Sequence, residues 1–514
     1  MSIPSPAIAD SPPNILMVLA DQHNAEWLGC AGHPQVLTPR LDAFASTGVR
    51  FTSAYAQNTV CTPSRVSILS GQYAHNHGHY GLSGNRNPGL PSLFGHLRDR
   101  GYRTAGYGKL HLPCEPLTWA SDHADEFADA YDSNDGVVGE GEFLKQLEAK
   151  GLRHLEDSWH NTEHYTSKSI PIDGAPSELP LEETQEMWCV RRAMDFMSRG
   201  DDRPFMIQVS FQKPHHPVLP NPRFWEQYAA DLDMPPDWDR RPDHRPPHFR
   251  QQWEDWRDYP FEFRGPGDGF ADCVRRSWRG TLACVTQVDH VFGVLLDFLD
   301  EAGLADNTIV IYGSDHGGYH GTHGLLEKAP GICSEAVCRV PMIWRVPGVT
   351  AAGADCDRLV ENVDYAPTFC ALAGVDPMPS ADGEDLSTLL RTPEAEGPRD
   401  VAVTENVWSR AVRWKDWRLV VYPRRMFGED VGELYHLADD PHERRNLYAE
   451  PDYLPVVNEG RARLLDWLVT HTRIVTPPNH RNRRPNRTVD LAADGRAANA
   501  WMPAHRDDML INYL

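Results

Sequence analysis

An unbroken apolar run at residues 15–20 is the feature that most constrains the fold. A strand that is apolar at every position is buried on both faces, which is typical of a parallel sheet covered by helices on two sides. Strand-like segments recur at residues 102–108, 205–211 and 308–312, and residues 285–299 carry the apolar spacing of an amphipathic helix. Strands that alternate with helices predict an α/β fold, with a large, mainly parallel sheet sandwiched by helices.

This α/β pattern extends over residues 1–395, which we interpret as one large domain. Two stretches interrupt it, one near residues 115–180, which is mixed and acidic, and one near 214–270, which is rich in Pro, Trp, Arg and Asp. Both are interpreted as insertions over the sheet, where lids and specificity loops are commonly found.

The character of the chain changes near residue 396. Residues 413–422 and 433–437 have the composition of antiparallel strands, and a helix is expected near 452–472. We therefore predict a small α+β domain over residues 396–475. The remaining residues, 476–514, are dominated by Pro, Asn and Arg and are expected to form an extended tail.

Composition narrows the classes of function. The formal net charge of −23 disfavours binding to nucleic acid or to an anionic membrane, because both require a basic surface. The amino terminus lacks the pattern of a secretory signal, and we expect no segment that spans a bilayer. The ten cysteines are scattered without CxxC pairs, as expected for buried thiols in a reducing compartment. We therefore expect a soluble cytoplasmic protein.

Residues that can act as acids, bases or ligands follow four of the predicted strands. They are Asp21 after the first strand, Lys109 and His111 after the second, His215 after the third, and Asp315 and His316 after the fourth. Ligands of open α/β sheets bind at the carboxyl ends of the strands, so these side chains predict an active site at that edge.

A short helix is predicted to begin at the sequence Cys61-Thr-Pro-Ser-Arg65, because Pro63 suits a first helical turn and Gly71 suits a helix end. Cys61 would then lie at a helix amino terminus. The free backbone N–H groups and the positive end of the helix dipole favour a negative charge at this position.

The segment Cys61–Arg65 followed by Gly71 resembles the signature of the sulfatases, formylglycine-dependent enzymes of the alkaline phosphatase superfamily. Further similar segments follow in the same order up to about residue 451, namely 101–111, 214–217, 303–317, 323–328, 363–368 and 440–443. The pairs Asp21-Gln22 and Asp315-His316 are similar to a branch near arylsulfatases, choline sulfatases and phosphonate monoester hydrolases.

The resemblance implies an alkaline-phosphatase-like fold and a set of site residues. The implied metal ligands are Asp21, the formylglycine made from Cys61, Asp315 and His316, with Gln22 as a further candidate. The implied ion is one divalent cation, Ca²⁺ in the first place and Mn²⁺ or Mg²⁺ as alternatives. The resemblance also implies that Arg65 orients the nucleophile and that Asp315 accepts its proton. Lys109 and Lys328 would bind the substrate anion, and His215, together with Lys328, would act as the general acid. His111 would act as the general base, and Asn85 would contact the substrate.

The resemblance implies a sulfuric ester hydrolase that cleaves aryl or small alkyl sulfate monoesters through a formylglycine hydrate and a sulfated hemiacetal. The alternatives are a phosphonate monoester or phosphodiester hydrolase with the same machinery, activity on both classes, or a protein that only binds an anion. His320 and His323 also leave a two-metal phosphatase site open. The implied partners are a small-molecule sulfate ester, a formylglycine-generating or sulfatase-maturating enzyme, and further copies of the chain in a dimer or tetramer held by the apolar tail.

Overall fold

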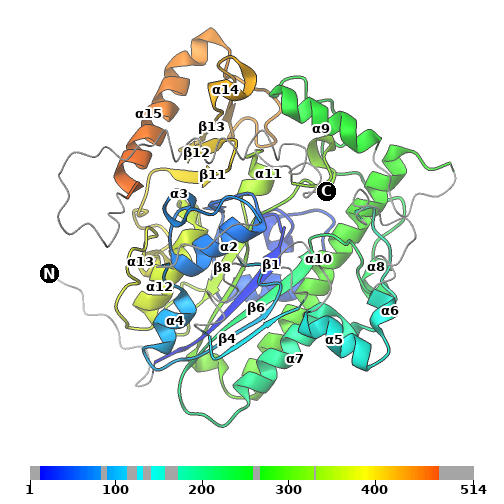
Figure 1. The fold of residues 1–514 in the computed structure, drawn as a ribbon, viewed down its shortest axis with the longest axis vertical. Coiled ribbons are helices and arrows are strands. Elements are labelled where there is room, and N and C mark those ends of the chain that lie inside the picture. Colours follow the sequence, from blue (N-terminus) through cyan, green and yellow to red (C-terminus); the bar gives the residue numbers. More distant parts are fainter. Residues whose placement is uncertain are drawn as a thin grey trace, which may run out of the picture.

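The computed structural model describes residues 12–82, 90–112, 124–130, 141–156, 172–258, 267–328 and 332–473. Asn85 and the predicted tail over residues 476–514 lie outside these ranges. A large sheet with helices on both sides forms the body of the molecule, and a smaller sheet with one long helix lies at one end (Figure 1).

The central sheet has eight strands. In spatial order they are β5 (Glu126–Asp129), β4 (Arg103–Gly108), β6 (Phe205–Pro214), β1 (Asn14–Asp21), β7 (Thr308–Ser314), β8 (Met342–Arg345), β2 (Val49–Phe51) and β9 (Ala354–Cys356). Strand β8 pairs antiparallel with both of its neighbours, and the other described pairs are parallel. The predicted mainly parallel sheet is confirmed.

Strand β1 shows why its sequence is apolar from residue 15 to residue 20. Alternate side chains of a strand point to opposite faces of the sheet. Ile15, Met17 and Leu19 belong to one hydrophobic core, whereas Leu16 and Val18 belong to the core on the other face. Burial on both faces excludes polar residues until the strand ends at Asp21.

Helices cover both faces of the sheet, on either side of the central strands in Figure 1. The core that contains Ile15 is completed by α2 (Cys61–Ser70), α4 (Leu93–Arg98), α12 (Tyr365–Leu372) and α13 (Ser387–Arg391). The opposite core is completed by α1 (Pro39–Ser46), α5 (Glu142–Ala149), α7 (Gln185–Met197) and α10 (Phe270–Glu301). The described helices therefore form the predicted sandwich.

Helix α10 is longer than the predicted helix at residues 285–299, because its first half also packs on the protein, through Val274, Trp278 and Leu282. Contrary to the expectation from sequence, α10 is long and apolar enough to cross a membrane by length and composition. However, 78% of its most apolar window is buried inside the protein. Its apolar residues are thus accounted for by packing on the sheet and its neighbours.

The two interpreted insertions contribute short elements. Within residues 115–180, β5 pairs with β4 at an edge of the central sheet, and α5 and α6 (Arg153–Glu156) follow it. Within residues 214–270 lie α8 (Pro222–Trp225) and α9 (Pro247–Arg257). The remaining short elements of the large unit are α3 (Ala74–His77), α11 (Glu335–Cys338) and the strand pair β3 (Ala54–Tyr55) and β10 (Val360–Glu361).

The carboxy-terminal region is a four-stranded antiparallel sheet. Its strands, in order, are β11 (Ala402–Glu405), β12 (Arg410–Trp414), β13 (Trp417–Val421) and β14 (Gly432–His436), and its helices are α14 (Arg424–Phe427) and α15 (Leu454–His471). The segment 413–422, predicted as one strand, is instead a hairpin that turns at Lys415 (φ 44°) and Asp416. Gly460 lets α15 approach the sheet, because a Cβ there would lie 2.6 Å from the Trp414 ring.

The small sheet is bonded to the chain that leads into α2. The hydroxyl of Thr404 donates to the carbonyl of Ala56 at 2.7 Å, and the Glu405 N–H donates to the carbonyl of Gln57 at 2.7 Å. The small sheet therefore supports the segment that precedes Cys61.

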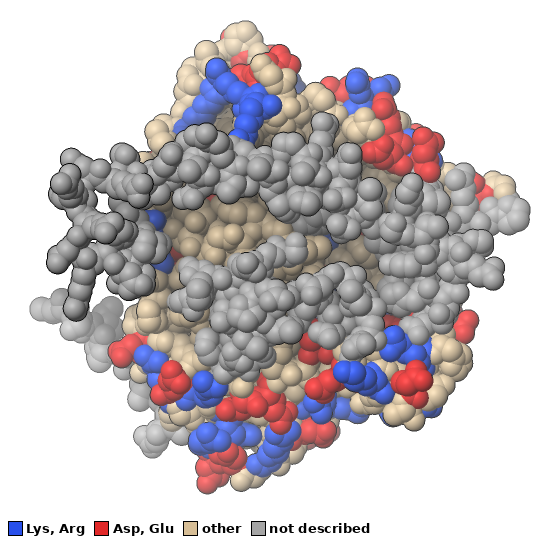
Figure 2. All heavy atoms as spheres, viewed as in Figure 1, with Lys and Arg blue, Asp and Glu red and all other residues tan. Residues whose placement is uncertain are grey.

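Charged side chains of the described residues lie mainly around the periphery of the face in Figure 2, and its hollowed centre exposes uncharged side chains.

Candidate active site

Four adjacent strands of the central sheet, β4, β6, β1 and β7, end at one edge and deliver the predicted residues there. The ammonium of Lys109 lies 2.8 Å from Oδ2 of Asp21. Nε2 of His215 lies 3.9 Å from Oδ1 of the same aspartate. Asp315 and His316 follow β7, which pairs directly with β1. Residues up to 295 positions apart in sequence, Asp21 and His316, thus converge because their strands are neighbours.

Cys61 is the first residue of α2 and is 2% exposed. Its Sγ lies 3.2 Å from Nε2 of His316 and 3.9 Å from Oδ1 of Asp21. The helix begins here because Val60 is extended and Asn58 accepts a hydrogen bond from the Val60 N–H at 2.9 Å. The helix amino terminus therefore points Cys61 at the strand ends.

Arg65 lies one turn after Cys61 and is completely buried. Its Nη2 donates to Oδ2 of Asp21, and its Nε donates to Oδ2 of Asp315, both at 2.8 Å. A third nitrogen, Nη1, donates to the hydroxyl of Ser210 at 2.7 Å. The planar guanidinium thus fixes both carboxylates at once, a geometry that lysine cannot reproduce.

The arrangement of ligand atoms fits a divalent cation. Arg65 binds the Oδ2 atoms of Asp21 and Asp315. Oδ1 of Asp21 lies 3.9 Å from both Cys61 Sγ and His316 Nε2. Oδ1 of Asp315 accepts the backbone N–H groups of His316 and Gln22 and lies 3.8 Å from His316 Nε2. The ring of His316 donates from Nδ1 to the Gly317 carbonyl at 2.7 Å, which leaves the Nε2 lone pair for a metal. The ligand atoms of Asp21, Cys61, Asp315 and His316 all lie within 4.8 Å of one another.

The two aspartates have opposite pKa shifts. Burial acts to raise the pKa of Asp21, but Lys109 and other nearby cations hold it well below its usual value. Burial also acts on Asp315, with repulsion from Asp21, and raises its pKa above the usual value despite Arg65. Carboxylates whose pKa values are pushed apart suit different roles. The two aspartates are therefore electrostatically different, although one arginine binds both.

Negative charge at position 61 is stabilised by its surroundings. Burial and Asp21 act to raise the pKa of the Cys61 thiol, but Lys328, Lys109 and His316 lower it to well below the usual value. Burial also lowers the pKa of His215 to about 3, with further lowering by His216 and the two lysines. His215 is therefore neutral at pH 7 in the free protein and must gain a proton before it can act as an acid.

Lys328 is joined to the loop after β1. Its Nζ donates to Oε1 of Gln22 at 2.8 Å and to Oε1 of Glu327 at 3.2 Å. Gln22 has a left-handed backbone (φ 64°), which turns its side chain toward Lys328. Its Nε2 contacts Nε2 of His320 at 2.9 Å. The amide oxygen of Gln22, a predicted metal-ligand candidate, is thus occupied by a lysine.

His111 and the histidine pair His320 and His323 do not join the Cys61 cluster among the described residues. The ring of His111 makes no hydrogen bond to the Cys61 cluster among the described residues, and its buried Nδ1 has no partner there. His320 is bonded to Gln22 and to Thr281 Oγ1 at 3.0 Å, and His323 packs on the Tyr319 ring. These contacts account for His320 without a second metal.

Glu327 and Ser210 also belong to the site, although no role was expected for them from sequence. Glu327 lies in the apolar context Leu325-Leu326, and a charged residue in such a run is a usable signal of a buried ion pair. Ser210 carries no signal, since a hydroxyl within a buried strand is common.

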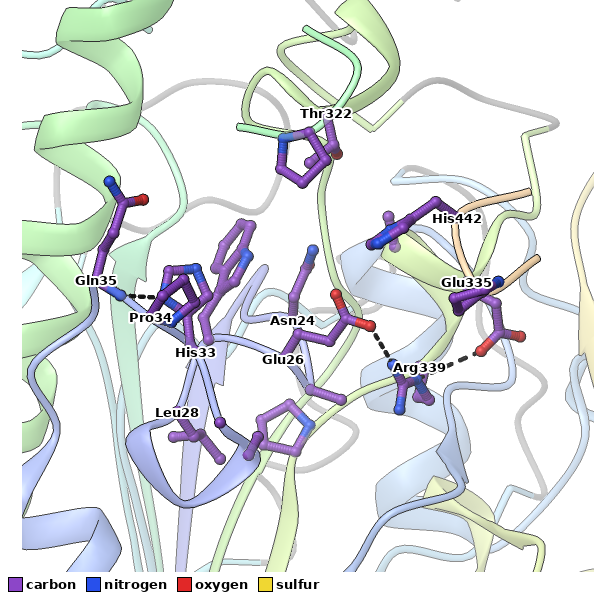
Figure 3. Close-up of a pocket in the computed structure, with 18 of the residues that line it drawn as sticks. Asn24, Glu26, Leu28, His33, Pro34, Gln35, Thr322, Glu335, Arg339 and His442 are labelled. Carbon is purple, nitrogen blue, oxygen red and sulfur yellow. Dashed lines mark hydrogen bonds and ion pairs between the residues drawn. The ribbon is translucent and has the colours of Figure 1, made fainter. Parts of the chain in front are cut away.

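The structure also contains a cavity of about 710 Å³. Its lining includes Asn24, which follows Asp21 by three residues, and Figure 3 shows Arg339 between Glu26 and Glu335 in its wall. None of the predicted catalytic residues lines it. The convergent chemistry, rather than the size of a cavity, therefore locates the candidate active site.

Comparison with known proteins decides the family. The sulfatase profile matches residues 13–375, well over half of the chain. The chain belongs to the sulfatase family. A second profile, N-sulphoglucosamine sulphohydrolase, C-terminal, matches residues 321–469 of this sulfatase. The predicted sulfuric ester hydrolase is thereby confirmed. The family uses a metal and formylglycine in general, and the buried cluster around Cys61 is compatible with both.

Individual relatives agree with this assignment. The sulfatase is 25% identical to an N-acetylglucosamine-6-O-sulfatase of Bacteroides thetaiotaomicron, with 86% of this chain and 83% of that protein covered. It is 27% identical to a choline-sulfatase of Rhizobium meliloti, with 84% and 83% covered. The structure of a phosphonate monoester hydrolase of Agrobacterium radiobacter has a TM-score of 0.73 at 23% identity, over 92% of this chain and 100% of that one. The predicted fold and family resemblance are confirmed.

Proposed function

We propose that this sulfatase hydrolyses sulfate monoesters of aryl or small alkyl alcohols, using formylglycine made from Cys61 and one divalent cation. The observation that carries the proposal is the convergence of Cys61 with Asp21, Asp315 and His316 at the amino terminus of α2. When present, the cation supplies positive charge to the ester oxygens, and hydrated formylglycine supplies a hydroxyl nucleophile. Ca²⁺ is the ion we favour, with Mn²⁺ or Mg²⁺ as alternatives, because two carboxylates suit a hard cation.

Lys109 and Lys328 are the groups that bind the sulfate oxygens. Both are buried, and both approach the cluster, Lys109 through Asp21 and Lys328 through Gln22. Burial lowers the pKa of Lys328, but the surrounding anions raise it above its usual value, so its ammonium stays charged. A buried, fixed positive charge stabilises a transition state more strongly than a solvated one.

His215 is the proposed general acid. Its Nδ1 contacts the His216 carbonyl at 2.7 Å, which orients the ring and directs Nε2 at the cluster. Since His215 is neutral in the free protein, the anionic substrate must raise its proton affinity on binding. Asp315 is the proposed proton acceptor for the nucleophile, and Arg65 holds it in place. His111 is retained as the proposed base for product release, on the resemblance alone.

Hydrolysis of phosphonate monoesters or phosphodiesters is the second candidate. The likeness of the fold to a phosphonate monoester hydrolase and the pairing of Asp21-Gln22 with Asp315-His316 favour it. Lys109 adds a positive charge that favours the sulfatase activity. Both activities in one site are compatible with these residues.

Kinetics on 4-nitrophenyl sulfate and on a 4-nitrophenyl phosphonate monoester, side by side, test the choice. We expect the higher kcat/KM on the sulfate. A higher value on the phosphonate overturns the first proposal in favour of the second.

Intact-mass analysis of the native protein checks the nucleophile. Replacement of the Cys61 thiol by an aldehyde changes the mass, whereas a free thiol supports an anion-binding protein.

The partners are also proposals. A formylglycine-generating or sulfatase-maturating enzyme is required if Cys61 is converted. We place the protein in the cytoplasm, on the composition of the sequence, and propose a dimer or tetramer in which residues 476–514 contact a neighbouring copy. Truncation at Thr476, followed by light scattering and kinetics, tests this. Unchanged mass of the assembly and unchanged kcat/KM contradict it.

A further inference from the structure

A second convergent group lies beside the metal-ligand cluster. Ligand atoms of His215, His216 and Glu327 lie within 4.8 Å of one another. However, Nζ of Lys328 lies 3.2 Å from Oε1 of Glu327, so the carboxylate already has a cationic partner. The other carboxylate oxygen of Glu327 accepts a hydrogen bond from His216. These residues therefore form a hydrogen-bonded network beside the metal-ligand cluster.

Glu327 fixes the tautomer of His216. Its Oε2 lies 2.6 Å from Nδ1 of His216, and a carboxylate only accepts, so the imidazole proton is on Nδ1. Glu327 is held in turn by the Gln22 amide at 3.2 Å and by the Lys328 backbone N–H at 2.8 Å. It is 3% exposed. The Glu327 carboxylate is thus a rigid acceptor for His216.

The other ring nitrogen of His216 is available to a ligand. Within the part of the chain that the structure describes, Nδ1 is the ring atom of His216 that carries a hydrogen bond, and Nε2 carries none. The side chain is 14% exposed, so the ring is held by the protein but still reached by solvent. In the neutral ring with its proton on Nδ1, Nε2 is a hydrogen-bond acceptor.

The position of His216 indicates which part of a substrate it meets. Its ring lies against that of His215, with 3.8 Å between the centroids. His215 is the proposed acid for the departing alcohol, so His216 lies on the side of the leaving group. Lys109, a proposed sulfate-binding lysine, contacts Asp21 at 2.8 Å, whereas Lys328 contacts Glu327 at 3.2 Å.

We propose that His216 determines specificity by accepting a hydrogen bond from a hydroxyl next to the sulfate ester, with Glu327 as its positioning residue. The favoured substrates are then sulfate monoesters of polyhydroxylated alcohols, such as sugars, in preference to bare alkyl sulfates. This inference rests on the proposed sulfatase function. A site built to bond a hydroxyl rejects an analogue that lacks it, because the buried acceptor is left unpaired.

Two matched esters test the proposal: 2-hydroxyethyl sulfate and propyl sulfate have the same chain length and differ in one hydroxyl. For the wild-type enzyme we expect kcat/KM at least about tenfold higher on 2-hydroxyethyl sulfate. His216→Phe is expected to reduce this ratio to within about twofold. Glu327→Gln is expected to lower the ratio in the same direction, since the amide does not fix the tautomer.

His436→Phe is the matched control. His436 also has its Nδ1 bonded to a carboxylate, that of Asp439 at 2.7 Å, but it lies on β14 in the small sheet. This variant should keep the wild-type ratio.

The ratio of the kcat/KM values of the wild-type enzyme on the two esters tests the proposal even where a variant does not fold. A ratio near one, or a high ratio that His216→Phe leaves intact, overturns the proposal while the sulfatase function stands. Turnover of neither alkyl sulfate nor of 4-nitrophenyl sulfate, by protein with converted Cys61 and bound metal, overturns the function itself.

Discussion

Two buried clusters of charged residues in this sulfatase have similar composition but different consequences. The first is the catalytic cluster of Asp21, Cys61, Arg65, Asp315 and His316. The second lies where the small sheet meets the large domain and is here called the peripheral cluster, composed of Arg245, Glu335, Arg418, Glu433 and Glu443.

In the peripheral cluster both carboxylate oxygens of Glu433 and both of Glu443 have protein partners. Glu443 receives Arg418 at 2.8 Å on Oε1 and Arg245 at 3.3 Å on Oε2. Glu433 receives the hydroxyls of Tyr422 and Tyr435, both at 2.6 Å. In the catalytic cluster Oδ1 of Asp21 instead faces the Cys61 thiol and the His316 imidazole, each at 3.9 Å, and Oδ1 of Asp315, which accepts the His316 backbone N–H at 2.9 Å, lies 3.8 Å from the same imidazole. Buried charge alone therefore does not mark an active site, whereas convergent ligand atoms directed at one point do.

Removal of the nucleophile should have the largest effect. We expect Cys61→Ala to lower kcat at least about a thousandfold, because it removes the group that attacks the ester. The fold should persist, since a helix amino terminus tolerates a small residue. Steady-state kinetics and thermal unfolding check this.

Cys284→Ala is the matched control for that variant. Cys284 is buried in α10, where burial raises the pKa of its thiol to about 12. Turnover should stay within about twofold of the wild type. A Cys61→Ala enzyme with normal kcat contradicts the assignment of the nucleophile.

A matched pair of arginine variants separates the two clusters. Arg65→Lys should lower kcat about a hundredfold or more and weaken metal binding, because one ammonium does not hold two carboxylates. Arg418→Lys should instead lower the free energy of unfolding by about 3 kcal/mol and leave kcat nearly unchanged. Kinetics, metal titration and denaturant unfolding measure both. Equal losses of kcat in the two variants would abolish the distinction.

If His215 is the general acid, the loss of kcat in His215→Ala depends on the leaving group of the ester. His215→Ala should slow an unactivated alkyl sulfate by about a hundredfold, because a poor leaving group needs its proton. The same change should slow 4-nitrophenyl sulfate less than about tenfold, because nitrophenolate leaves without one. The ratio of kcat values on the two substrates reports the role. Equal losses on both remove His215 from it.

Asp289 on α10 is a buried carboxylate outside both clusters, and of the changes described its substitution is expected to have the smallest effect. It accepts the Leu41 backbone N–H at 2.7 Å, and burial raises its pKa to about 7. The folded state therefore binds its proton more tightly than the unfolded state between about pH 4 and pH 7. Stability contributed by this group is present at low pH and is lost as the pH rises through this window, by about 2–4 kcal/mol.

Asp289→Asn isolates that contribution, since an amide does not titrate. The difference in unfolding free energy between wild type and variant should change between pH 4 and pH 7 in favour of the variant. A difference that stays constant over this range contradicts the raised pKa of Asp289.

The sequence predicted those parts of the site that follow strand ends. Asp21, Lys109, His215 and Asp315 were found because buried strands are apolar and polar residues begin where they end. The contact between Gln22 and Glu327 was not found, since it joins residues 305 positions apart through a left-handed turn. The hairpin at Lys415 was missed because neither Gly nor Pro marks it.

The central claim is that the catalytic cluster holds one cation, and a crystal structure of the metal-replete enzyme tests it most directly. We expect one ion between Oδ1 of Asp21, Oδ1 of Asp315, Nε2 of His316 and residue 61, and none in the peripheral cluster. Absence of a cation at that point, or two ions about 4 Å apart as in two-metal phosphatases, would contradict it.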